Sequence, residues 1–335
     1  MKRILITGAS GFLGSFVVQE ALDRGLDTWA GVRGSSSRGY LQDERIRFIS
    51  LDYRGVDTLC AQLQEDALRN GRFDVIVHCA GVTKCVDPVD FDRVNYLQTR
   101  TFVEALIKCG LVPDSFVYIS TLSVFGPVRE KDYTEIQDTD PMAPNTAYAK
   151  SKQKAEDFLK SQKDFPFVIL RPTGIYGPRE KDYFLMAKSI MSHMDFSVGF
   201  KRQDITFVYV KDVVQAIFKA VDKGVRGKAY FLSDGKVYQS KTFSNLLIRE
   251  LNQKMVFRVR CPLCILYLVS LIMEGWSRLT GRSSTLNTDK YHIMSQRNWR
   301  CDITPAKRDL DYAPEYPLDR GVKETVAWYR KEGWL

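Results

Sequence analysis

Two kinds of segment alternate along the chain: short apolar runs and stretches with helical periodicity. An unbroken apolar run is typical of a strand buried on both faces of a parallel sheet, and apolar residues spaced by three and four indicate a helix with one buried face. Strands are predicted over residues 4–6, 28–32, 45–51, 73–78, 115–120, 167–170 and 229–232. Helices are predicted over residues 16–22, 56–68, 91–109, 147–160 and 213–221. The alternation predicts an α/β protein built on a doubly wound parallel sheet.

The first predicted strand runs directly into a turn with three glycines. The turn is made by Gly8, Ser10, Gly11, Phe12, Leu13 and Gly14. Glycine lets the turn tighten, lets the backbone approach a pyrophosphate, and lets the helix lie close to the strand. The helix N-terminus then offers unpaired N–H groups and the positive end of its dipole to the phosphates. A glycine-rich turn also occurs in other α/β proteins, but the strand before it and the helix after it favour a dinucleotide site.

The glycine spacing, Gly-x-x-Gly-x-x-Gly, resembles that of the extended short-chain dehydrogenases/reductases, which include epimerases, dehydratases and hydroxysteroid dehydrogenases. The resemblance implies a Rossmann-type sheet with a smaller C-terminal α/β substrate lobe. It implies that Asp52 contacts the adenine, although a simple turn aspartate is the plainer interpretation, and Tyr53, Pro172 and Thr173 are further candidates for cofactor binding. The small residues after the fourth strand, Cys79-Ala80-Gly81, would let the cofactor lie against the backbone.

The end of the second predicted strand bears on the choice of cofactor. NAD-specific sites usually hold the ribose 2′-hydroxyl with an acidic residue there, and this chain has Arg33 followed by Gly34 and three serines. A cation with nearby hydroxyls suits a 2′-phosphate. We therefore predict a preference for NADP(H), with NAD(H) as the alternative. An exposed loop arginine without a cofactor contact is the plainer interpretation.

Three residues predict a catalytic set. Tyr148 and Lys152 are four positions apart, so one helical face presents both side chains. A lysine ammonium close to a tyrosine favours the phenolate and lowers its pKa, which would make Tyr148 a general acid/base. Thr121, at the end of the fifth strand, would orient the substrate oxygen. A Tyr-x-x-x-Lys pair also occurs on solvated helix faces. Here, however, the motifs come in the same order as in the family: the glycine turn, then the Ser/Thr strand end, then the Tyr-x-x-x-Lys helix. This order favours the catalytic interpretation.

Two departures from the family pattern bear on the substrate. Dehydratases of the family carry acidic residues directly after the catalytic threonine, where this chain has Leu122 and Ser123, so dehydration is disfavoured. The arginine that pairs with a nucleotide-sugar diphosphate is absent, although Arg202 lies nearby in sequence.

The C-terminal tail is similar to that of hydroxysteroid dehydrogenases and dihydroflavonol reductases. We therefore predict an oxidoreductase acting on a hydrophobic hydroxy or keto compound. A nucleotide-sugar epimerase with tightly bound NAD is the alternative, and a non-catalytic cofactor-binding sensor is a third hypothesis.

Composition bears on three questions: nucleic-acid binding, cellular location and metal binding. The net charge of +9 comes from cations spread along the chain with no basic, aromatic-interleaved patch, which disfavours nucleic-acid binding. Seven cysteines, an odd number, suggest reduced thiols, and no signal peptide is visible, so a cytoplasmic location is expected. The three histidines have no metal-type spacing, and no metal site is predicted; His78 is interpreted as structural.

The apolar stretch 261–273 is too short to span a bilayer, which takes about 20 residues. It predicts a core helix, a lid over the substrate, or an interfacial helix with Trp276 and Arg278 as anchors, and residues 262–278 could contact a membrane surface weakly.

The chain is expected to divide into two lobes. Residues 1–172 with 205–234 would form the dinucleotide-binding domain, and residues 173–204 with 235–335 the substrate lobe. The resemblance implies a homodimer that pairs the helices near 91–109 and 147–160 in a four-helix bundle.

Overall fold

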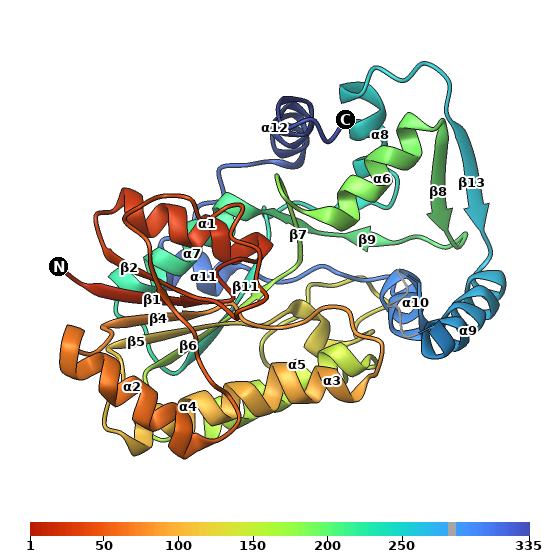
Figure 1. The fold of residues 1–335 in the computed structure, drawn as a ribbon. Coiled ribbons are helices and arrows are strands. Elements are labelled where there is room, and N and C mark those ends of the chain that lie inside the picture. Colours follow the sequence, from red (N-terminus) through yellow and green to blue (C-terminus); the bar gives the residue numbers. More distant parts are fainter. Residues whose placement is uncertain (281–285) are drawn as a thin grey trace.

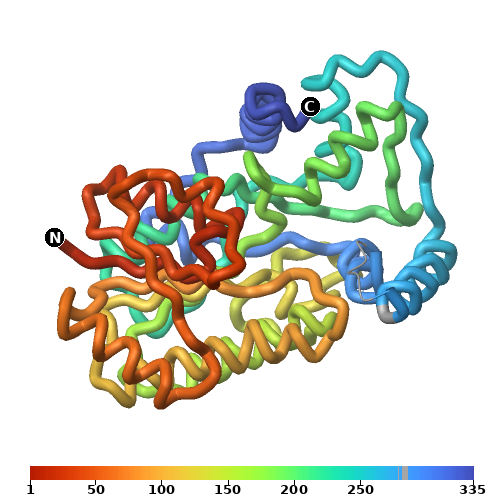
Figure 2. The backbone as a smooth tube through the Cα atoms, viewed as in Figure 1, coloured from red at the N-terminus to blue at the C-terminus, as the bar shows by residue number. Residues whose placement is uncertain are grey.

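The structure is a computed structural model that describes residues 1–280 and 286–335, apart from the side chain of Arg278. Figure 2 shows the N-terminal half of the chain gathered into one body, with much of the C-terminal third forming a smaller body beside it.

A seven-stranded parallel sheet forms the centre of the larger body (Figure 1). Its strands, in spatial order, are β11 (Lys228–Leu232), β6 (Phe167–Pro172), β5 (Ser115–Ile119), β4 (Val75–His78), β1 (Arg3–Thr7), β2 (Asp27–Gly31) and β3 (Arg47–Ile49). The order of the strands reverses between β1 and β4, where Thr7 pairs with His78. In such sheets ligands bind outside the carboxyl ends of the strands at this reversal.

Helices cover both faces of the sheet, as the unbroken apolar strands require. One face is covered by α1 (Phe12–Asp23), α7 (Val210–Asp222) and α11 (Thr304–Leu310), and the other by α2 (Val56–Asn70), α4 (Gln98–Lys108) and α5 (Ala147–Ser161). Along β1, Ile4 and Ile6 join the core under α1 while Leu5 joins the core under α2 and α4. The predicted doubly wound Rossmann-type sheet is confirmed.

The predicted helix over 91–109 is present as one continuous helical segment, but part of it is π-helical, which was not predicted. It consists of α3 (Val89–Phe91), a π-helical segment (Asp92–Leu97) and then α4. Periodicity cannot reveal the wider turn, because one extra residue per turn shifts the apolar pattern only locally.

The smaller body has an aromatic core around Tyr176, Phe207 and Phe243. Its helices are α6 (Lys181–Met191), α8 (Thr242–Glu250), α9 (Leu263–Thr280), α10 (Thr288–Ser295) and α12 (Leu318–Lys331). Its strands form three pairs: β7 (Gly174–Tyr176) with β10 (Phe207–Tyr209), β9 (Asp204–Ile205) with β12 (Tyr238–Gln239), and β8 (Met194–Val198) with β13 (Phe257–Cys261).

Two details refine the expected lobes. Residues 207–209 form β10, which pairs with β7 rather than with the main sheet, whereas β11 joins the sheet beside β6. Helix α11, late in the chain, packs on β11 and α7. The division into two domains at the stated boundaries stays a prediction.

Helix α9 contains most of the apolar stretch, from Leu263 onward, and the exposure of this helix contradicts the core-helix interpretation. Leu268 and Ile272 are 58% and 62% exposed, and only Leu266 among its leucines is buried. The Arg278 side chain, expected as an anchor, lies outside the described residues. In the parts of the chain that the structure describes, none of the helices has the length and hydropathy needed to cross a bilayer.

Candidate functional site

The glycine turn packs too closely against the sheet for other side chains. Gly8 has φ +65°, and a Cβ there would lie 2.7 Å from the backbone nitrogen of Ala80. A Cβ on Gly14 would lie 2.9 Å from Cα of Ala9 and would collide with the Gly8 carbonyl. Gly11 precedes α1 without a side-chain cap, and the first turn of α1 has no acidic residue. The N–H groups at this helix end are therefore available to an anion.

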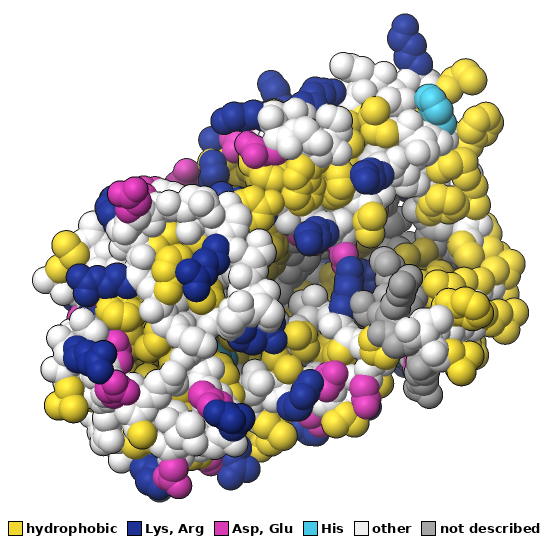
Figure 3. Space-filling model, in the orientation of Figure 1, with side chains coloured by type: hydrophobic (Ala, Val, Ile, Leu, Met, Phe, Trp, Pro, Cys, Tyr) yellow, Lys and Arg dark blue, Asp and Glu magenta, His cyan; other side chains and the backbone are white. Residues whose placement is uncertain are grey.

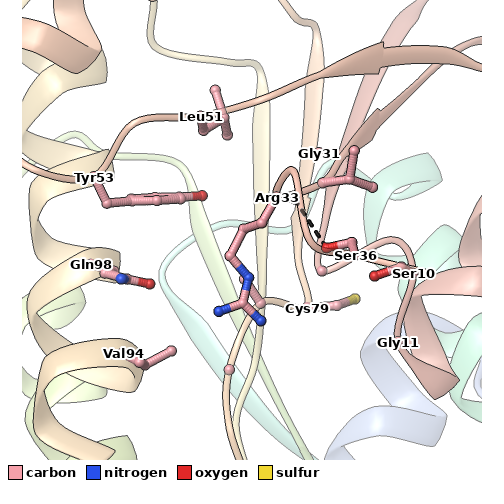
Figure 4. A pocket seen from close by; sticks show the side chains of 14 residues that line it. Ser10, Gly11, Gly31, Arg33, Ser36, Leu51, Tyr53, Cys79, Val94 and Gln98 are labelled. Carbon is pink, nitrogen blue, oxygen red and sulfur yellow. Dashed lines mark hydrogen bonds between the residues drawn. The ribbon is translucent and has the colours of Figure 1, made fainter. Parts of the chain in front are cut away.

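A cavity of about 160 Å³ opens beside this turn at the carboxyl ends of β1, β2 and β4 (Figure 4). It is lined by Gly8, Ser10, Gly11, Gly31, Val32, Arg33, Ser36, Leu51, Tyr53, Cys79, Ala80, Gly81, Val94 and Gln98. The cavity lies at the strand reversal, where the fold places ligands. Half of the predicted cofactor-binding residues, eight of sixteen, line this cavity.

Sequence reasoning missed two cavity residues that lie on the segment after β4. Val94 and Gln98 are four positions apart, one in the π-helical turn and one at the start of α4. Their spacing puts them on one helical face, and that spacing was the signal that could have found them.

Arg33 is exposed, and in Figure 4 its side chain extends into the cavity between Tyr53 and Ser36. Its backbone N–H donates to Ser36 Oγ at 3.1 Å. The loop of glycine and serines after β2 therefore holds a cation at the cavity mouth.

Asp52 does not line this cavity. Its carboxylate accepts hydrogen bonds from Nε of Arg54 at 2.8 and 3.0 Å, and this contact lowers the pKa of Asp52. The adjacent Tyr53 supplies the cavity wall instead. The direction of the Asp52 side chain depends on Arg54, a local pair that the family pattern did not reveal.

The remaining predicted cofactor contacts lie outside the cavity wall. Phe12, Leu13 and Gly14 form the first turn of α1, behind the glycines. Pro172 ends β6 and Thr173 follows it. The Thr173 hydroxyl is buried and has no hydrogen-bond partner among the described residues, so it has capacity to bind a ligand group.

The predicted catalytic residues meet at the end of β5. Thr121 follows β5, and its hydroxyl accepts the N–H of Ser123 at 3.2 Å. Tyr148 lies in the first turn of α5 and Lys152 one turn later. The Lys152 ammonium donates to the carbonyl of Ile119 at 2.8 Å and lies 4.7 Å from the centre of the Tyr118 ring.

The electrostatics differ from the expectation that Lys152 lowers the pKa of Tyr148. Burial raises the pKa of the Tyr148 phenol to about 12, opposed only by its hydrogen bond with Thr121. Burial lowers the pKa of Lys152 to about 8. The reason is that the ammonium is directed to Ile119 and Tyr118, so its charge does not act mainly on the phenol.

Lys152 connects this set to the cavity. A Cβ on Gly81 would lie 3.4 Å from the Lys152 nitrogen, and Gly81 lines the cavity. Asn95, fully buried in the π-helical turn, links the chain after Gly81 to α5. Its side chain accepts the N–H of Val82 at 2.8 Å and donates to the Val82 carbonyl and to Ser151 Oγ, both at 3.0 Å. The cavity and helix α5 are therefore held together by short hydrogen bonds that are partly or fully buried.

Asp289 is another residue that sequence reasoning missed. From α10, its carboxylate accepts the N–H groups of Ala147 at 3.0 Å and Tyr148 at 3.2 Å. These are orphan donors of the first turn of α5, which a carboxylate satisfies well. No local signal could have found this contact, because it joins residues 141 positions apart.

His78 has the structural role expected of it. Its ring nitrogens bond the hydroxyls of Thr7 at 2.8 Å and Thr99 at 3.0 Å, and burial lowers its pKa to about 3. The imidazole is therefore neutral near pH 7 and ties β4 to β1 and α4.

The sequence profile of the NAD dependent epimerase/dehydratase family matches residues 4–233. The chain belongs to this family. The resemblance stated from the motifs is thereby confirmed, and the family is one of NAD-dependent enzymes.

The relatives perform different reactions. The dTDP-D-glucose 4,6-dehydratase of Homo sapiens is 26% identical over 98% of this chain and 90% of its own length. The decarboxylating sterol-4-alpha-carboxylate 3-dehydrogenase of Saccharomyces cerevisiae is 25% identical over 98% of both chains. The structure of the UDP-glucuronic acid 4-epimerase of Bacillus cereus in complex with NAD is similar with a TM-score of 0.76 at 20% identity, covering 98% of this chain and 99% of that one.

Proposed function

We propose that this member of the family is an NAD(P)-dependent oxidoreductase that interconverts a secondary alcohol and a ketone. The observation that carries the proposal is the position of Lys152, which adjoins Gly81 in the cavity wall. Tyr148 lies one helical turn away on α5, and Thr121 follows β5. The cavity proposed for the cofactor thus lies directly beside the three side chains proposed to handle protons.

The residues present fit a nicotinamide dinucleotide. The turn at Gly8 and Gly14 leaves no space for a Cβ, α1 offers free N–H groups, and the buried Thr173 hydroxyl lacks a partner among the described residues. The proposed contacts are those predicted from the sequence, with Tyr53, Val94 and Gln98 in the wall and without Asp52. When bound, the nicotinamide supplies the acceptor or donor of a hydride.

Each catalytic side chain has one proposed task. Thr121 orients the substrate oxygen. Tyr148 takes the hydroxyl proton when the alcohol loses a hydride from its carbon, and returns that proton to the carbonyl oxygen in the reverse reaction. Lys152 holds a ribose hydroxyl of the cofactor. The phenol, with its pKa raised to about 12, is protonated near pH 7 and suited to act as the acid in reduction.

A preference for NADP(H) over NAD(H) is the finer proposal for the cofactor. It rests on Arg33, whose side chain extends into the cavity where NAD-specific sites have an acidic residue. The solved relative named above contains NAD.

A substrate of low polarity is the proposal for the second reactant. Leu122 is buried and Ser123 bonds Thr121, so neither position supplies the acid that dehydration needs. Arg202 makes two hydrogen bonds to the buried Asp204 carboxylate, at 2.6 and 2.7 Å, and is thereby committed rather than free for a diphosphate. The yeast relative is named as a dehydrogenase of a sterol carboxylate, whose sterol skeleton is hydrophobic.

Nucleotide-sugar epimerisation is the second candidate. It is supported by relatives whose names specify nucleotide sugars, the human dehydratase and the Bacillus cereus epimerase. An epimerase reduces and reoxidises its cofactor within one turnover, so it produces no net change in NAD(P)H.

The test is the net change in NAD(P)H absorbance with a panel of steroid, flavonoid and nucleotide-sugar alcohols and ketones. We expect turnover with an apolar member and its loss, by about 10³-fold or more, in Tyr148→Phe, because the phenol carries the proton. Tyr267→Phe, an exposed tyrosine of α9, is the matched control and should be fully active. Retained turnover in Tyr148→Phe would remove the phenol from its role, and isomerised sugar without an absorbance change would favour the epimerase.

The homodimer remains part of the proposal. Helices α4 and α5 lie side by side on one face of the sheet, as a four-helix pairing of two copies would need (Figure 1).

A further inference from the structure

The two-stranded ribbon of β8 and β13 has one apolar face. The strands are parallel and in register, so Met194, Phe196 and Val198 share a face with Phe257, Val259 and Cys261. Phe196 and Phe257 are 59% and 65% exposed. A sheet face of this composition normally packs against a helix or a second sheet, and here no such partner covers it among the described residues.

Helix α9, which follows β13 directly, is apolar on its outer side. A surface helix usually turns its apolar stripe inward and its polar residues outward. In α9 the residues buried against the protein are Leu266, Ser270 and Ser277. The exposed ones are Ile265, Tyr267, Leu268, Val269, Leu271, Ile272, Met273, Trp276 and Leu279. Among the described side chains of this 18-residue helix, the usual arrangement is thus largely reversed.

These two surfaces form one region at the end of the molecule distant from β2 and α2. Figure 3 shows hydrophobic side chains gathered along this edge, over β8, β13 and α9. We call this region the apolar edge: the apolar face of the β8–β13 ribbon together with the outer side of α9. Exposed patches of this extent mark surfaces that bind a protein or a membrane.

The charges around the apolar edge decide between these partners. Segments 192–203 and 253–280 contain the cations Lys201, Arg202, Lys254, Arg258, Arg260 and Arg278, and the acidic residues Asp195 and Glu274. Asp195 is buried beside Arg258, and Glu274 bonds the backbone and hydroxyl of Thr288. Lys201, Lys254 and Arg260 are exposed. The rim of the edge is therefore positive, which complements an anionic lipid surface and would repel a second copy of the same rim.

We propose that the apolar edge binds the surface of a membrane with anionic lipids. The leucine, isoleucine and phenylalanine side chains enter the boundary between headgroups and acyl chains, and Trp276 lies at headgroup depth. The cations at the rim pair with lipid phosphates. Helix α9 lies along the surface, because Leu266, Ser270 and Ser277 hold its other side to the protein and Tyr267 packs on Tyr291 of α10.

The test is co-sedimentation of the full chain with vesicles of phosphatidylcholine alone and of phosphatidylcholine mixed with phosphatidylglycerol. We expect binding to the anionic vesicles. The partition coefficient should fall by about 10-fold or more in Leu268→Glu/Ile272→Glu, because two side chains that would be buried in the membrane are lost. Leu68→Glu in α2, a leucine 88% exposed, is the matched control and should bind normally. Lys254→Gln/Arg260→Gln should weaken binding to anionic vesicles only.

Absence of wild-type binding to anionic vesicles would overturn the proposal. So would equal loss in Leu68→Glu, or vesicle-independent dimers that Leu268→Glu/Ile272→Glu dissociates in sedimentation velocity, which would identify a second copy as the occupant. Unchanged NADH binding in the α9 variant shows that it is folded, and because vesicle binding is read without turnover, its outcome is independent of the proposed reaction.

Discussion

At the scale of single residues, the candidate site contains groups whose burial has an energetic cost. The Lys152 ammonium is only 5% exposed, and its pKa is lowered to about 8 by burial, whereas a lysine in the unfolded chain has a pKa of about 10.4. At pH 7 Lys152 is charged in both the folded and the unfolded chain. Keeping this charge buried therefore lowers the stability of the folded state by about 3 kcal/mol. Such a cost is typical of functional sites.

Lys152→Met should therefore stabilise the fold at pH 7, by about 1–3 kcal/mol after loss of the Ile119 hydrogen bond. Between pH 8 and about 10.4 the unfolded state binds more protons than the folded wild type, so the wild type gains stability with rising pH and the advantage of the variant shrinks. Chemical denaturation at pH 7 and pH 10 measures this, with the exposed Lys150→Met as control. An advantage of equal size at both pH values would contradict the buried ammonium.

Arg33 is the residue on which the choice of cofactor depends. Arg33→Ala should weaken NADPH binding by about 10-fold, the loss of one charge-assisted hydrogen bond, and NADH binding much less. Arg38→Ala, in the same loop with its guanidinium on the Phe48 ring, is the matched control. Fluorescence titrations with both cofactors measure the effect; equal weakening of both, or a wild type that prefers NADH, would show that Arg33 does not contact a 2′-phosphate.

At the scale of elements, helix α5 is held in place at its N-terminus and again in its second half. Glu156, fully buried, accepts hydrogen bonds from Arg171 at the end of β6 and from Ser120 after β5. Although burial raises it, the charge of Arg171 lowers the pKa of Glu156 overall. At the N-terminus of α5, Asp289 of α10 accepts two N–H groups. The direction of Tyr148 thus depends on residues far away in sequence.

Asp289→Ala should reduce kcat by about 10-fold with little change in the affinity for NADH, because it frees the first turn of α5 that carries Tyr148. Asp289→Asn, which can still accept from one N–H, should restore part of the rate. Asp302→Ala removes a similar carboxylate, one that accepts the N–H of Thr304 in α11, and should leave kcat unchanged. If Asp302→Ala lowered kcat as much, Asp289 would have only a general stabilising role.

The elements that sequence reasoning located are those with local signals. Strand β1 and the Gly8 turn follow from an apolar run and glycine spacing, and the pair Tyr148 and Lys152 from a four-residue interval. The π-helical turn over Asp92–Leu97 and the pairing of β10 with β7 have no local signal, because they are determined by neighbours distant in the chain.

At the scale of the whole molecule, a strand reversal, a glycine turn and a catalytic helix meet at one edge of one sheet. The sequence could not show whether the apolar stretch 261–273 is buried or exposed, because its composition suits either. Only the packing of α9 shows that most of its side chains are exposed. Likewise, only the structure shows that the Asp52 carboxylate bonds Arg54 and that Tyr53, not Asp52, lines the cavity.

The most direct test of the central claim is a fluorescence titration of the purified protein with NADH and NADPH, for the wild type, Tyr148→Phe and Gly11→Val. A Cβ at position 11 would lie 3.1 Å from the Gly8 carbonyl, in the cradle beside the N-terminus of α1, so the larger side chain obstructs the place proposed for the pyrophosphate. The account predicts one cofactor per chain in the wild type and in Tyr148→Phe, and at least about 10-fold weaker binding in a folded Gly11→Val. Failure of the wild type to bind either nucleotide, or unchanged binding in Gly11→Val, would contradict it.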